Sequence, residues 1–161
     1  MTGLGLSVLR LVLAVVFVAH GAHILFGAWP GPGAGPGGLE ATARQYAALG
    51  LQPDSLLATL AGVIQLAGGV LIGFGLLTRS AALALLAYVG FGIWIEHWKW
   101  GFFLNWLRNP QQGVGIEYSV MLAGALVCLL FTGGGEWSID GQRTNSRAQR
   151  AAGRARLRGK L

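Results

Sequence analysis

The residues best able to do chemistry in this 161-residue sequence are histidines and carboxylates placed within or at the ends of long apolar runs. His20 and His23 are three residues apart in the first run, while Glu96 and His97 are adjacent at the end of the third. Imidazole and carboxylate groups can exchange protons with a ligand or bind a metal ion. Because an ionisable group facing lipid at the bilayer centre costs about 2.5 to 3.5 kcal/mol, such residues are candidates for function.

Four apolar runs are the elements that must position these residues. Hydrophobic residues make up 53% of the chain and charged residues only 11%, whereas a soluble domain averages about 25% charged residues. A membrane-spanning helix needs about 20 apolar residues. The expected spans are residues 4–26, 56–77, 81–95 and 115–131. The sequence therefore predicts an all-α membrane protein, with four transmembrane helices in one bundle domain over residues 1–141.

The loops and the basic tail predict the orientation of this bundle. Residues 29–38 are rich in Gly and Pro and predict a flexible loop. Residues 39–50 predict a short helix at the membrane surface, in the first outer loop. Seven of the 12 Lys and Arg lie in the last 19 residues, so the positive-inside rule places both termini in the cytoplasm. The tail, residues 142–161, is expected to be disordered and to lie near anionic lipid rather than to bind nucleic acid.

With this topology the polar residues converge in the outer half of the bundle. Residues three, four and seven apart share one face of a helix, and small residues on such a face permit close helix contact. Three stripes are predicted to face the interior: Ala61, Gln65, Gly69 and Gly73; Ala84, Tyr88, Gly92 and Glu96; and Glu117, Met121, Gly124 and Cys128. Together they predict a polar pocket shared by the helices.

The same residues leave other interpretations open. His20, His23 and His97 with a carboxylate could bind zinc, copper or iron. Glu96 and His97, however, point about 100° apart on an α-helix, and the E-x-x-H pairs of di-iron bundles are absent. A pocket lined by aromatic, His and Glu side chains suits a quinone headgroup at least as well, so a metal is the less favoured occupant. Gln65 could instead be a structural hydrogen bond between helices, worth about 0.6 kcal/mol on average. Arg10 is expected to snorkel to the inner interface.

Five stretches follow one another between Leu9 and Gly141: "LRLVLAVVFVAHGAHILFG", "LAGVIQLAGGVLIGFGLLTRSAAL", "GFFLNW", "GIEYSVMLAGAL" and "GEWSIDG". Their order resembles the DoxX family of small bacterial membrane proteins, and is similar to the DoxD subunits linked to quinone-dependent thiosulfate oxidation. The resemblance implies a multi-pass four-helix bundle in the bacterial plasma (inner) membrane, in some cases associated with redox complexes.

The family's site pattern is matched in part. His20 and Gly21 match the H-G-x-x-K pattern of the first helix, but His23 stands in place of Lys. Gln65 stands in place of the Glu in the E-L-x-G-G pattern of the second helix, so a possible ion pair is lost. The resemblance also matches Glu117 and Tyr118 to the family's G-x-E-Y pattern, and Asn105 lies in the matching "GFFLNW".

Three functions are consistent with these observations. The first is a redox-associated subunit that binds a quinone or a small thiol or sulfur compound and works with a protein partner. Whether this subunit is itself an oxidoreductase is left open by the sequence. In it, His20 and Glu117 would exchange protons as the catalytic residues. The residues expected to bind or orient the ligand are His23, Gln65, Tyr88, Glu96, His97, Asn105 and Tyr118. The alternatives are a non-enzymatic scaffold for a partner complex and a small-solute transporter, which would need to form a homo-oligomer.

Overall fold

A computed structural model describes residues 2–31, 35–107, 109, 111–146 and 149, and this part of the chain is helical, as predicted. Its named elements are α1 (Thr2–Phe26), α2 (Leu39–Ala48), α3 (Asp54–Phe74), α4 (Thr78–Gly92), the π-helical turn η1 (Ile93–His97), the 3₁₀ turn η2 (Trp98–Trp100) and α5 (Glu117–Thr132). Residues 139–146 are also helical. The predicted helix boundaries are therefore correct to within a few residues.

Three of these helices are long and apolar enough to cross a membrane: Gly3–Phe26, Asp54–Phe74 and Thr78–Trp100. Helix α5 is equally apolar but has only 16 residues, which rise about 24 Å, short of the ~30 Å of a hydrocarbon core. The fourth span thus stays a prediction.

Helices α1 and α3 pack most closely, through small residues. A Cβ atom built on Gly69 would lie 2.9 Å from the backbone nitrogen of Val18, so the two backbones almost touch there. Ala61, Gln65 and Gly69 are buried on the facing side of α3. The predicted interior stripe of this helix is confirmed, and its glycines explain the short separation of the helices.

Helix α5 packs differently from the prediction. Leu126 and Leu129 are fully buried against Leu85 and Val89 of α4, whereas Met121 is 70% exposed. The stripe of Glu117, Met121, Gly124 and Cys128 does not face the core, since its last three members are exposed. Adjacent residues of an α-helix point about 100° apart, so the stripe of Leu126 and Leu129 lies on a different side of the helix from the predicted stripe. The stripe with the bulky leucines faces the interior because it buries more apolar surface.

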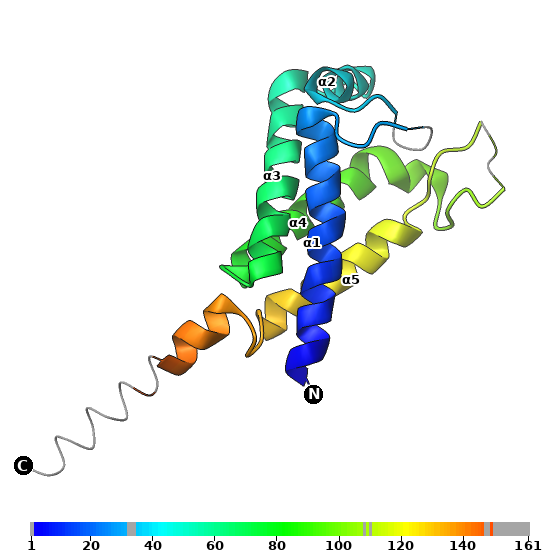
Figure 1. Cartoon of the computed structure of the whole chain (residues 1–161). Helices are drawn as coiled ribbons and strands as arrows, with labels where there is room; N and C mark the ends of the chain where they lie inside the picture. The colour runs from blue at the N-terminus through cyan, green and yellow to red at the C-terminus, as the bar shows by residue number, and fades with distance from the viewer. Residues whose placement is uncertain (1, 32–34, 108, 110, 147–148, 150–161) are drawn as a thin grey trace, which may run out of the picture.

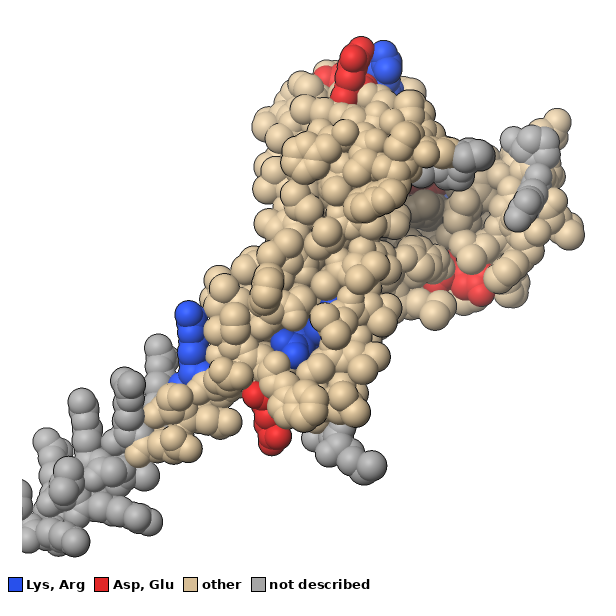
Figure 2. All heavy atoms as spheres, in the orientation of Figure 1, with Lys and Arg blue, Asp and Glu red and all other residues tan. Residues whose placement is uncertain are grey.

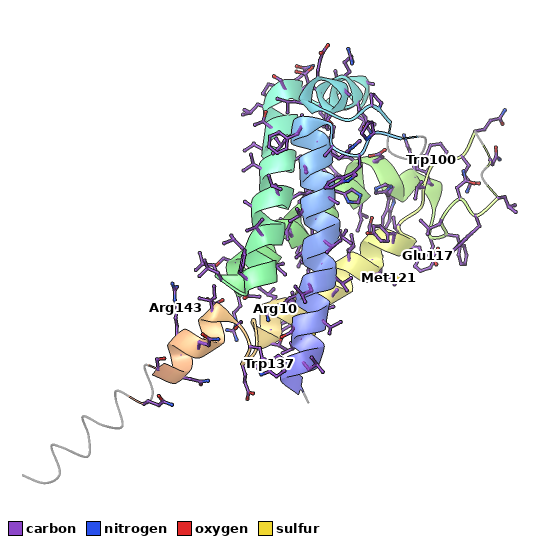
Figure 3. The ribbon with its side chains drawn as sticks, viewed as in Figure 1. Arg10, Trp100, Glu117, Met121, Trp137 and Arg143 are labelled. Carbon is purple, nitrogen blue, oxygen red and sulfur yellow. The ribbon has the colours of Figure 1, made fainter. Side chains whose placement is uncertain are left out.

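Arg10 does not snorkel, contrary to the prediction. Its side chain is only 3% exposed, and Nη2 donates to Ser7 Oγ (3.1 Å) and to the Trp137 carbonyl (3.0 Å). The segment that follows α5 folds back under the bundle and supplies that carbonyl (Figure 3). A local acceptor is thus available to Arg10, and the sequence pattern of α1 alone could not indicate it.

Asp140, in the same returning segment, caps helix α4. Its carboxylate accepts hydrogen bonds from the backbone nitrogens of Leu77 (3.1 Å) and Thr78 (2.9 Å) and from Thr78 Oγ1 (3.0 Å). Burial alone would raise the pKa of Asp140, but these hydrogen bonds, with Arg143 nearby, hold the pKa below its ordinary value. Residues 142–146, the start of the segment predicted to be a disordered tail, are helical, and most of the rest of that segment lies outside the described residues.

The N-terminus and residues 139–146 lie at one end of the molecule, and α2 lies at the other (Figure 1). Figure 2 shows, on the face it presents, a broad area free of Lys, Arg, Asp and Glu between these two ends. Helix α2 forms close to the predicted residues and contains no buried side chain.

Candidate functional site

A cavity of about 280 Å³ lies toward the α2 end of the bundle, with walls from α1, α3, α4, η1 and α5 and with α2 contributing Tyr46. Six of the predicted site residues line it: His20, Gln65, Tyr88, Glu96, His97 and Tyr118. The remaining lining is largely apolar and includes the rings of Phe17 and Phe91. The structure thus brings together, in one chamber, residues that are up to 98 positions apart in the chain.

The two histidines of the cavity are held in the same tautomer. Nδ1 of His20 lies 2.9 Å from the Val16 carbonyl oxygen, and Nδ1 of His97 lies 2.9 Å from that of Val114. A carbonyl oxygen only accepts hydrogen bonds, so each Nδ1 carries the proton and donates it. In the neutral ring, Nε2 is then an acceptor, and within the described residues it has no protein partner in either histidine. Two residues of the lining therefore each carry an Nε2 atom that can accept a hydrogen bond.

The π-helical turn η1 explains why Glu96 and His97 can both face this space. In a regular α-helix adjacent residues point about 100° apart. Ile93–His97 form a π-helical turn instead, whose i→i+5 hydrogen bonds widen the helix and reduce the rotation per residue. Such turns are frequent at functional sites, and here the turn lets two consecutive polar side chains share one cavity.

Tyr46 is a cavity residue that the sequence analysis did not identify. Its side chain shares a hydrogen bond with Tyr88 of α4, and its neighbour Gln45 donates to Glu96 Oε1 (3.4 Å). Burial raises the pKa of the Tyr46 hydroxyl, the hydrogen bond to Tyr88 opposes this shift, and the charge of Glu96 adds to it. Helix α2 was recognised as amphipathic, but no local signal indicated that it covers the pocket.

Three predicted site residues do not line the cavity. Nδ1 of His23 donates to the Ala28 carbonyl (2.7 Å), and its ring packs on Gly37, so it supports the Gly/Pro loop. Asn105 donates to the carbonyls of Asn109 and Gln112 (both 2.7 Å) and closes the loop before α5.

The third is Glu117, at the first turn of α5 (Figure 3). Its Oε2 accepts a hydrogen bond from the Leu104 backbone nitrogen (3.0 Å), and its own backbone nitrogen donates to the Phe102 carbonyl (2.9 Å). These bonds tie "GFFLNW" to "GIEY", which makes Glu117 a loop-anchoring residue in this structure. The structure does not bring it together with His20 in the cavity.

The charge of the cavity limits what it can bind. Glu96 is its only carboxylate, and no Lys or Arg is among its lining residues in the described part of the chain. Within the same part of the chain, no group of three or more His, Cys, Asp and Glu side chains is placed to hold a metal ion. The arrangement can accept protons or hydrogen bonds from a ligand with an aromatic or apolar body.

These features define a helical membrane protein with a small cavity between its helices, lined by apolar and polar side chains. Residues 5–98, more than half of the chain, match the DoxX family, and the chain belongs to that family. An uncharacterized membrane protein of Mycobacterium tuberculosis (strain ATCC 25618 / H37Rv) is 29% identical over 153 residues, which cover 87% of this chain and 81% of the relative. No solved structure matches the chain.

Proposed function

We propose that this protein is a subunit of a membrane redox complex and binds the headgroup of a lipid quinone in the cavity. The observation that carries the proposal is the shared lining by His20, His97 and Glu96 among aromatic rings. A quinone headgroup is a flat ring that exchanges protons at two oxygens, so it needs apolar surface and protonatable partners together. His20 and His97 supply the proton-accepting groups.

The volume and charge of the cavity support a quinone over a sulfur oxyanion such as thiosulfate. The cavity volume of about 280 Å³ lies just below the ~300 to 1,000 Å³ range of ligand pockets, which suits one ring rather than a large ligand. An anion would meet the Glu96 carboxylate without a lining Lys or Arg to offset it. A neutral ligand does not incur that repulsion.

The proposed orientation has four spans, with α5 as the fourth, and both termini in the cytoplasm of a bacterial cell. The start of α1 and residues 139–146 lie at one end of the molecule (Figure 1), which supports an even number of spans between them. Trp29, Trp94, Trp98 and Trp106 are 69 to 75% exposed near the α2 end, as an aromatic belt at the outer interface requires. In this orientation the cavity lies toward the outer leaflet, and the exposed apolar side chains contact lipid or a protein partner.

Glu117 is proposed as a positioning residue rather than a proton carrier. Its carboxylate fixes the loop over 102–104 to the start of α5, and the next residue, Tyr118, lines the cavity. Glu117→Gln is expected to keep one acceptor for the Leu104 nitrogen and therefore to bind quinone within about threefold of the wild type.

A side chain added at Gly92 tests the proposal. Gly92 lines the cavity, and a Cβ built there meets no atom within 4 Å, so the side chain of Gly92→Leu starts in open space beside the cavity and is expected to occupy part of it. Gly90→Leu is the matched control, because Gly90 is on the same helix, is exposed, has the same open space and does not line the cavity. Both variants and the wild type are placed in lipid nanodiscs and titrated with trimethyl-1,4-benzoquinone and its 1,4-hydroquinone, with tryptophan fluorescence as the readout.

We expect saturable binding of at least one of the two forms to the wild type and to Gly90→Leu, and a loss of at least tenfold in affinity for Gly92→Leu. If neither form binds the wild type, or if Gly92→Leu binds as tightly as Gly90→Leu, the proposed function is wrong.

A further inference from the structure

Hydrogen-bond acceptors outnumber donors on the wall of the cavity. Nε2 of His20 and Nε2 of His97 are acceptors because each Nδ1 is committed to a carbonyl. The side chain of Gln65, 3% exposed, turns its Nε2 to the Ala61 carbonyl (3.4 Å), so its Oε1 is the amide atom left for a ligand. The Glu96 carboxylate, which only accepts when ionised, is the fourth acceptor.

The possible donors are fewer. The hydrogen bond between Tyr46 and Tyr88 uses one of their two hydroxyl protons. The other proton of this pair, the hydroxyls of Tyr118 and Ser119 and the second amide proton of Gln65 are the remaining side-chain donors among the described lining residues. Because the hydroxyl oxygens of these residues also accept, the acceptors stay in excess. An occupant that only accepts hydrogen bonds, as an oxidised quinone does through its two carbonyls, cannot pair with any of the four acceptors of the wall. The penalty is largest at Gln65, whose side chain is buried, because leaving a buried polar atom without a partner is unfavourable.

We propose that the cavity selects the reduced form of its ligand, a ring with two hydroxyl groups, and binds the oxidised form more weakly. Each hydroxyl of a hydroquinone donates to one acceptor of the wall, and the Nε2 atoms of His20 and His97 are the acceptors whose orientation the backbone fixes. The inference rests on the proposed function, since it specifies which oxidation state the same site binds. It concerns binding and hydrogen-bond donation alone.

Three probes of one ring size separate this inference from the proposed function: trimethyl-1,4-benzoquinone, its 1,4-hydroquinone and the 1,4-dimethoxy ether of that hydroquinone. The ether has the shape of the hydroquinone but cannot donate. With the full chain in nanodiscs under anaerobic conditions, we expect the hydroquinone to bind about tenfold more tightly than either of the others, the difference expected for two hydrogen bonds. Equal or tighter binding of the quinone overturns the inference and leaves the proposed function standing.

Two variants assign the selectivity to the histidines. His20→Phe and His97→Phe each keep an aromatic ring at the cavity and remove one Nε2 acceptor. Each is expected to lower the preference for the hydroquinone to about threefold, while the affinity for the quinone changes less than twofold. A purely structural role would weaken all three probes equally, and that result would overturn the inference. Both variants are measured, so that the test stands if one of them fails to fold.

An organic cation is the competing occupant, because the cavity holds one carboxylate among aromatic rings. Phenyltrimethylammonium serves as the probe. If it binds more tightly than the hydroquinone, and Glu96→Gln removes that binding while the exposed control Glu40→Gln does not, the inference is wrong.

Discussion

The close approach of α1 and α3 predicts that one methyl group at Gly21 will disturb both the bundle and the cavity. Gly21 follows His20 on α1 and faces the backbone of α3. A Cβ built on Gly21 would lie 2.8 Å from the Cα of Leu66 and closer still to its backbone nitrogen. Ordinary contacts of a Cβ begin at 3.4 Å, so the helices must separate by at least about 0.6 Å, and a backbone atom cannot yield by changing its rotamer.

The expected size of the effect follows from this overlap. Inserting one methyl group into a tightly packed interior costs about 1 to 3 kcal/mol. The helical preference of Ala over Gly offsets up to about 1 kcal/mol of that cost. Gly124→Ala is the control that measures the helical preference of Ala alone, because a Cβ built on Gly124 would meet no atom within 4 Å. Relative to this control, Gly21→Ala should therefore unfold with a free energy lower by about 1 to 3 kcal/mol.

The assay is a titration of both variants with sodium dodecyl sulfate in mixed micelles, followed by far-ultraviolet circular dichroism and tryptophan fluorescence. We also expect Gly21→Ala to bind the quinone or hydroquinone more weakly, since displacement of α1 moves His20 away from Gln65 of α3. If Gly21→Ala and Gly124→Ala unfold at the same detergent fraction, the close packing of α1 on α3 is refuted.

Three further predictions follow. Asp140→Asn should weaken the cap of α4 and lower the free energy of unfolding by about 0.5 to 2 kcal/mol at neutral pH. Because folding lowers the pKa of Asp140 below its ordinary value of 3.8, the stability advantage of the wild type should be lost as the pH falls below 3.8 and the carboxylate is protonated. A stability difference that does not change with pH would contradict the assignment of this effect to the Asp140 carboxylate. Tyr88→Phe should remove the hydrogen bond to α2 and speed amide exchange in residues 39–48, whereas unchanged exchange would show that α2 is held by other contacts. In a Cys128→Ser background, Glu40→Cys should react with a membrane-impermeant maleimide in intact cells and Thr144→Cys only after lysis, and the reverse pattern would contradict the proposed orientation.

Much of the fold was predictable because apolar length and small-residue spacing are local properties of the chain. The run that contains Gln65 gave both the position of α3 and its buried face, since Ala61 and Gly69 permit only one side to approach α1. The interior face of α5 was not predictable in the same way. Nearly every side chain in that helix is apolar, so hydrophobicity alone does not distinguish the stripe of Leu126 from that of Met121.

Part of the cavity lining was predictable from the sequence, and its geometry was less so. Depth along the helices grouped His20 and Gln65 with residues at the end of α4, and these residues line one cavity. The π-helical turn that orients Glu96 departs from the α-helical period, and the docking of Tyr46 depends on contacts across more than 40 residues. Glu117 matched a family pattern, but a motif does not tell whether a carboxylate contacts a ligand or the backbone of a neighbouring loop.

Photolabelling with a radioactive azido-quinone tests the central claim most directly. The protein in native membranes is irradiated with the probe, with and without an excess of unlabelled quinone as competitor. It is then digested, and the labelled peptides are sequenced. We predict competed labelling within residues 16–20, 46–51, 88–97 or 118–122 or at Gln65, which contribute the lining of the cavity. This labelling should be lost in Gly92→Leu but not in Gly90→Leu. Competed labelling confined to other segments, or labelling unchanged in Gly92→Leu, would contradict the assignment of this cavity as the quinone site.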